Sequence, residues 1–114
     1  MGERCRWCGR PLPTRAATGR PRRYCRAGCR QQAHIARKYA EVHGLGDDDV
    51  IIDRLQLEEL QGALYCLQAA IEDVDGDLEG SPSAAEVRTA LNWLLDNARP
   101  LAAIWIEPKA DLGS

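Results

Sequence analysis

Four cysteines in the first third of the chain form two close pairs, Cys5-x2-Cys8 and Cys25-x3-Cys29, separated by sixteen residues. Two pairs that approach from opposite sides can complete a tetrahedral thiolate site, the coordination that zinc prefers in structural sites. Four thiolates leave no position open for a water molecule, so a metal held here stabilises the fold and does no chemistry. We therefore expect one structural Zn²⁺ bound by Cys5, Cys8, Cys25 and Cys29.

Other uses of paired cysteines are less favoured. No apolar signal segment follows Met1, which favours a cytoplasmic location, where thiols stay reduced, over a disulfide framework. Iron–sulfur clusters usually have different cysteine spacings, and a redox Cys-x2-Cys motif belongs to a βαβ context that this sequence does not show. Cys66 has no nearby partner in the sequence and is expected to be an inert thiol.

The charges of the chain are unevenly distributed. Residues 1–40 carry eleven basic side chains and one acid, whereas residues 41–114 carry four basic and sixteen acidic side chains, which gives net charges of +10 and −12. Such asymmetry predicts that the basic part binds a polyanion, with nucleic acid the common case. The alternative is that the two parts attract each other, within one chain or between copies.

Local signals place the cysteines on a small zinc-binding fold. Gly9 follows the first pair and permits a tight turn with positive φ, and the prolines and glycine within residues 10–24 favour a short irregular hairpin. From Cys25 onward the pattern becomes helical until Gly44. A zinc knuckle, a short hairpin and a helix whose first turn supplies the last two ligands make a treble-clef finger, here the module of residues 1–44.

The residues around the second pair also resemble a known family. The run Tyr24-Cys25-Arg26-Ala27-Gly28-Cys29-Arg30 is similar to the FCS-type (MYM-like) zinc finger, in which an aromatic residue precedes the third cysteine and an arginine often follows the fourth. The stretch from Gly19 to Ala33 is similar to small, uncharacterised actinobacterial proteins with such fingers. This chain has Tyr24 in place of Phe and Arg26 in place of Ser. The resemblance covers residues 5–38 and implies the four cysteines as ligands, while fingers of this kind serve protein contacts as well as nucleic acid.

The helix expected after Cys25 gathers its basic side chains on about a third of its circumference. A zinc-anchored basic face can lie against phosphates, and each contact releases counterions, so binding should depend on salt. His34 is favoured as a surface or phosphate-contacting residue because four thiolates already satisfy zinc, and Trp7 is favoured as a packing residue over a base-stacking one. We expect this face to bind nucleic acid, with DNA favoured. The expected contact residues are Arg22, Arg23, Arg26, Arg30, His34, Arg37 and Lys38.

Residues 45–114 predict an acidic module that folds as an antiparallel helical hairpin. Asp47–Asp49 are expected to cap a first helix from about Val50 to Val74. The capping box Ser83-x-x-Glu86 opens a second helix after a glycine-marked turn, and Pro100 is expected to end or kink it. Two helices joined by a short link pack antiparallel.

Aliphatic residues repeat at alternating spacings of three and four along both predicted helices, which is typical of an a/d seam. A hairpin alone cannot bury both apolar faces, so it must pack on the finger's helix or on another copy. We favour a homodimer in a four-helix arrangement over packing on the finger's helix. The expected interface residues are Leu57, Leu60, Leu64, Leu67, Ile71, Leu91 and Leu94.

The sequence therefore predicts a mainly α protein in which a small treble-clef zinc finger precedes an antiparallel helical hairpin. It shows no Gly-rich phosphate loop, no Ser/His/Asp set and no histidine beside the metal turn of the kind found in HNH nucleases, so we expect a non-enzyme. No apolar run approaches the length of a membrane span. Two functions remain open: a zinc-stabilised nucleic-acid-binding regulator, or a protein-interaction adaptor whose hairpin engages a partner.

Overall fold

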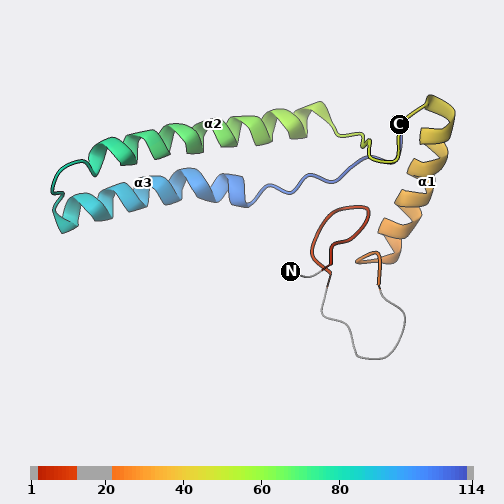
Figure 1. The fold of residues 1–114 in the computed structure, drawn as a ribbon, viewed down its shortest axis with the longest axis horizontal. Coiled ribbons are helices and arrows are strands. Elements are labelled where there is room, and N and C mark those ends of the chain that lie inside the picture. The colour runs from red at the N-terminus through yellow and green to blue at the C-terminus, as the bar shows by residue number, and fades with distance from the viewer. Residues whose placement is uncertain (1–2, 13–21, 113–114) are drawn as a thin grey trace. The chain divides into compact units, whose positions relative to one another are not determined.

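In a computed structural model, which describes residues 3–12 and 22–112, the protein is mainly helical. Its helices are α1 (Ala27–His43), α2 (Arg54–Asp77) and α3 (Ala84–Ala102), and the described residues contain no strand (Figure 1). None of these helices combines the length and apolar character needed to span a lipid bilayer. The short hairpin expected within residues 10–24 falls largely on residues 13–21, outside the described residues.

Contacts divide the chain into two compact units. The first, which we call the cysteine unit, comprises Met1–Asp53 and Ile106–Ser114, and the second, the hairpin unit, comprises Arg54–Trp105. The chain thus returns to the cysteine unit after the hairpin, and an isolated antiparallel bridge pairs Ile51 with Lys109 there. The domain division into residues 1–44 and 45–114 stays a prediction.

Helix α1 ends where the sequence predicted, at Gly44. This residue has φ of 72°, a left-handed conformation that glycine adopts without a steric penalty. The N–H groups of Gly44 and Leu45 both donate to the carbonyl of Ala40, which would otherwise lack a helical partner. His43 in the last turn stacks on Tyr39, with ring centroids 4.1 Å apart.

Helix α2 begins at Arg54 rather than near Val50, because the residues before it are engaged in other contacts. The Asp49 carboxylate accepts a hydrogen bond from the N–H of Gly46 at 2.7 Å and closes a turn. The carbonyl of Ile51 accepts the N–H of Lys109 at 2.7 Å, which holds this segment extended. The prediction that Asp47–Asp49 cap α2 is therefore wrong.

Helices α2 and α3 lie side by side and run in opposite directions (Figure 1). The link between them includes Gly80, whose φ of 79° reverses the chain. The predicted capping box at the start of α3 is confirmed: the N–H of Glu86 donates to Ser83 Oγ at 3.2 Å, and the N–H of Ser83 donates to Glu86 Oε1 at 3.1 Å. Pro100 does not end α3, which continues to Ala102.

The most buried residue of each hairpin helix is an alanine, Ala70 in α2 and Ala90 in α3. Small side chains at these positions let the two backbones approach closely, and larger aliphatic residues fill the space on either side. This packing of α2 on α3 divides the predicted interface residues into two groups. Leu57, Leu60, Leu67 and Leu94 are half-buried, whereas Leu64, Ile71 and Leu91 are exposed.

Candidate metal centre and basic surface

Cys5 and Cys8 lie on a tight turn that closes at Gly9. The N–H of Gly9 donates to the Cys5 carbonyl at 3.0 Å, and Gly9 has φ of 77°. The N–H of Arg6 donates to the carbonyl of Arg23 at 2.9 Å, which holds this turn beside the segment that leads into α1. The backbone therefore brings the first cysteine pair to the start of α1. Cys29 lies in the first turn of this helix, but Cys25 precedes it, so the prediction that the first turn supplies both ligands is wrong for Cys25.

The four cysteine sulfur atoms converge on one point. All four Sγ atoms lie within 4.8 Å of one another, and Cys25 Sγ is 3.6 Å from the Sγ atoms of both Cys8 and Cys29. A tetrahedral zinc ion with Zn–S bonds of about 2.3 Å has sulfur–sulfur edges of about 3.8 Å. A disulfide bond, at about 2.05 Å, is far shorter, and none of the five cysteines forms one. The four residues could therefore hold a single metal ion.

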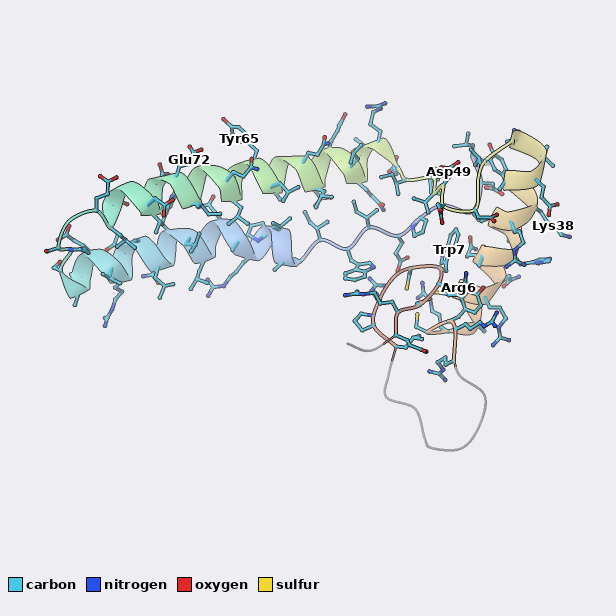
Figure 2. The ribbon with its side chains drawn as sticks, viewed as in Figure 1. Arg6, Trp7, Lys38, Asp49, Tyr65 and Glu72 are labelled. Carbon is cyan, nitrogen blue, oxygen red and sulfur yellow. The ribbon has the colours of Figure 1, made fainter. Side chains whose placement is uncertain are left out.

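The cysteine cluster is also the core of its unit. Cys5, Cys8 and Cys29 are buried, and the partly buried side chains packed against them include Trp7, Leu12 and Tyr24. Trp7 thus has the packing role that the sequence favoured, and Figure 2 shows it beside the turn that carries Arg6. Apolar residues around the sulfur atoms limit the access of water to the site.

Thiol groups this close to one another differ in how readily they ionise. Burial acts to raise the pKa of Cys5, but hydrogen bonds from the backbone at Cys8, Cys25 and Trp7 outweigh it and lower its pKa to about 6. A hydrogen bond with the side chain of Cys29, together with burial, raises the pKa of Cys25 to about 12. Burial likewise raises the pKa of Cys29. In this folded arrangement, Cys5 therefore loses its proton more readily than Cys25 and Cys29 do.

Zinc binding is accordingly expected to release protons. A zinc ligand must be a thiolate, and the raised pKa values of Cys25 and Cys29 mean that both thiols must deprotonate when the ion binds near neutral pH. We expect at least two protons released per zinc ion, and an affinity that falls as the pH is lowered. Isothermal titration calorimetry in two buffers of different ionisation enthalpy measures the number. Binding without proton release would contradict ligation by these two cysteines.

Two arginines beside the cysteine cluster share one acidic partner. A hydrogen bond to the side chain of Cys29 and the nearby charge of Glu107 raise the pKa of Arg26, whose Nη2 lies 3.6 Å from Glu107 Oε1. Arg10 forms an ion pair with the same carboxylate. The sequence did not reveal Glu107, because no local pattern connects it with residues near the start of the chain. Arg10 and Arg26 of the basic part therefore pair with an acid of the acidic part, as the alternative explanation of the charge distribution expects.

The basic side chains near the start of α1 line two adjoining hollows. The first has a volume of about 620 Å³ and the second about 390 Å³, and both include Tyr24, Ala27 and Arg30 in their linings. Among the described residues that line the two hollows, none is acidic. The basic lining residues are Arg22, Arg23, Arg26, Arg30, His34 and Arg37.

Six of the seven predicted nucleic-acid contacts thus meet around these hollows, and Lys38 does not. Lys38 is exposed on α1 and points away from Trp7 (Figure 2). His34 lines the second hollow rather than the metal site, to which the four cysteines alone contribute. Tyr24 was missed as a surface residue, although an aromatic residue flanked by Arg22, Arg23 and Arg26 was a usable signal.

No family model, no curated protein and no solved structure matches this chain. The resemblance to the FCS-type finger therefore rests on the residues around Cys25 and Cys29. Function has to be argued from the cysteine cluster, the hollows beside it and the helical hairpin.

Proposed function

We propose that this protein is a zinc-stabilised nucleic-acid-binding protein, with a regulatory role on DNA in the first place, and that its helical hairpin mediates homodimerisation. The proposed role is binding rather than catalysis. The observation that carries it is the pair of basic hollows that adjoin the cysteine cluster.

Zinc is the proposed ion because four cysteine sulfurs with tetrahedral spacing suit it, and because all four positions are then filled by protein. Cys5 and Cys8 on a glycine-closed turn, Cys25 just before α1 and Cys29 in its first turn are the elements of a treble-clef finger. We assign the cysteine unit to that type. When bound, the ion would fix the start of α1, and with it the direction of the arginines that follow.

The hollows favour a polyanionic ligand. Five arginines and one histidine are among the described residues that line the hollows. Arg26 pairs with Glu107, and the other four arginines favour a positive potential there. Arginine forks match phosphate oxygens in a bidentate geometry, and contacts to several phosphates add because each releases counterions. A nucleic-acid backbone presents phosphates in a row, which a helix edge lined by arginines can follow.

The hairpin unit has one apolar side that its own two helices do not cover. Ile71 directly follows the buried Ala70, and Leu91 directly follows the buried Ala90. One residue turns a side chain by about 100° around a helix, and in two antiparallel helices the same step leads to the same side of the pair. We call this side the outer apolar face; it comprises Leu64, Ile71, Val87 and Leu91, which are 40%, 44%, 43% and 51% exposed.

A second copy is the proposed occupant of the outer apolar face. The face is a stripe along both helices, and two such stripes packed together make a four-helix bundle with a continuous apolar core. Dimerisation would also bring two basic surfaces onto one nucleic acid, which raises the effective concentration of the second surface once the first is bound.

The charge reversals Arg30→Glu and Arg37→Glu, made together, test the nucleic-acid function. The assay is a mobility-shift titration of zinc-loaded protein at low salt with random-sequence DNA, single- or double-stranded. We expect the double variant to bind this DNA at least about tenfold more weakly than the unaltered protein does. The slope of log affinity against log salt should also become shallower, by the amount expected for the loss of about two phosphate contacts. The matched control is Arg54→Glu with Arg99→Glu, two exposed arginines of the hairpin unit.

Absence of any retention on DNA at low salt would sink the nucleic-acid function. The outer apolar face then favours the second candidate, a protein-interaction adaptor in which the hairpin engages another protein and the cysteine unit is purely structural. A stable complex in a pull-down that is lost on substitution of Leu64 and Leu91 would support that function.

A further inference from the structure

We propose that the two hollows bind unpaired nucleotides of a single strand, and that Tyr24 is the surface on which a base stacks. This inference rests on the proposed nucleic-acid function and names its substrate class. It differs from a mode in which α1 would lie in a groove of duplex DNA.

The shape of the basic surface carries the first step. To read a duplex, a helix must project its side chains outward into a major groove about 12 Å wide. Here Arg26, Arg30 and Arg37 are exposed and surround open hollows beside α1, of about 620 and 390 Å³, rather than forming one convex ridge. An unpaired nucleotide can enter a concave site of this kind, whereas a base within a duplex is held in the stack. Proteins that bind single strands combine a positive groove with aromatic side chains.

Tyr24 carries the second step, because it belongs to both the core and the surface. It packs against the buried cysteine cluster, and it lines both hollows. A ring held by the core loses little freedom when a base stacks on it. Trp7, the aromatic residue for which the sequence offered stacking as an alternative, lines neither hollow.

The arrangement of charge around Tyr24 carries the third step. Arg22, Arg23 and Arg26 line the first of the two hollows that share Tyr24. Arg37 lines the second, and Arg30 lines both. Because an α-helix rises about 1.5 Å per residue, Arg30 and Arg37 lie about 10 Å apart along the axis. A strand whose base stacks on Tyr24 would thus meet guanidinium groups at phosphates before and after that base. Every base has a π face, so the site should tolerate many sequences.

The experiment compares four labelled probes with zinc-loaded, full-length protein by fluorescence anisotropy. The probes share one length of about twelve nucleotides: single-stranded DNA, single-stranded RNA of the same sequence, the DNA duplex, and an abasic strand that keeps the phosphates but lacks bases. We expect either single strand to bind about tenfold more tightly than the duplex. The abasic strand should lose between about 5-fold and about 150-fold in affinity, the range of one stacked base.

Variants of Tyr24 give the second arm. Tyr24→Leu keeps an apolar side chain against the cysteine cluster but removes the π face, so it should lose the same factor on the normal strand and almost nothing on the abasic strand. Tyr24→Phe should bind like the unaltered protein. The zinc content of each variant checks that it is folded. The abasic probe tests base stacking with the unaltered protein, so that arm of the experiment does not depend on how a variant folds.

Equal binding of the abasic and normal strands would overturn the inference, and so would a duplex bound as tightly as the single strand. In both cases, binding that still depends on Arg30 and Arg37 leaves the proposed nucleic-acid function standing. Binding to none of the four probes contradicts that function itself. Equal affinity for DNA and RNA supports recognition of base and phosphate alone, and tighter binding of RNA supports the same site with an added contact to the 2′-hydroxyl.

Discussion

Removal of the metal is expected to unfold the cysteine unit while α2 and α3 remain helical. In the described part of the cysteine unit, the buried residues are Cys5, Cys8, Cys29 and Ala110, so almost no apolar core remains to hold it together without the ion. Structural zinc contributes on the order of 10–16 kcal/mol to small domains of this kind, which exceeds the stability of most domains. A chelator, or the substitution Cys29→Ser, should therefore have the same effect.

A two-dimensional NMR spectrum can follow both units at once through their tryptophan indole signals. Trp7 packs against the cysteine cluster, whereas Trp93 lies in α3 and donates from Nε1 to Asp73 Oδ2 of α2 at 3.1 Å. On chelation we expect the Trp7 signal to move to its random-coil position and the Trp93 signal to stay. Cys66→Ser is the matched control, because Cys66 is exposed and outside the cluster. A native Trp7 signal in protein shown to contain no metal would contradict the prediction.

Charges placed on the outer apolar face are expected to turn the proposed dimer into a monomer. Leu64→Glu and Leu91→Glu, made together, remove four leucine side chains from a symmetric interface. At about 1 kcal/mol for each half-exposed leucine that a dimer would bury, the dissociation constant should rise by about a thousandfold, before any cost of burying carboxylates. Sedimentation equilibrium over a range of protein concentrations measures the change.

The helices themselves should survive this substitution, since both leucines are exposed in the hairpin and Ala70 and Ala90 remain between the helices. Circular dichroism checks this point. The matched control is Tyr65→Glu: Tyr65 is next to Leu64 and 72% exposed, but it points away from α3 (Figure 2). It should leave the dimer intact. An unaltered protein that is monomeric at high concentration would count against the dimer and in favour of an adaptor that uses the face for another protein.

Features encoded by neighbouring residues were predicted well. The end of α1 follows from Gly44, because few other residues adopt its left-handed conformation at low cost. The start of α3 follows from Ser83 and Glu86, whose side chains satisfy each other's backbone N–H groups. The convergence of the four cysteines follows from their spacing, since few arrangements place one such pair on a short turn and the other at the start of a helix.

Features that depend on distant contacts could not be predicted. Aliphatic residues spaced alternately by three and four can define more than one apolar face on each helix. Only the packing of α2 on α3 determines that the faces containing Ala70 and Ala90 are the buried ones. Glu107 reaches Arg26 because the chain returns to the cysteine unit, which no local pattern shows. The start of α2 was misplaced for the same reason, since the partner of Ile51 is Lys109.

The pairing of Ile51 with Lys109 makes the hairpin unit an insertion between two segments of the cysteine unit. The chain leaves the cysteine unit after Asp53 and re-enters it at Ile106, so both ends of the hairpin are tied to residues that already contact each other. Insertions between such tied ends add little closure entropy as they lengthen, about 0.6 kcal/mol for each doubling. A longer, shorter or different hairpin can therefore replace this one while the cysteine unit keeps its own backbone pairing. The proposed partner contacts of the hairpin and the proposed ligand contacts of the cysteine unit can then change independently.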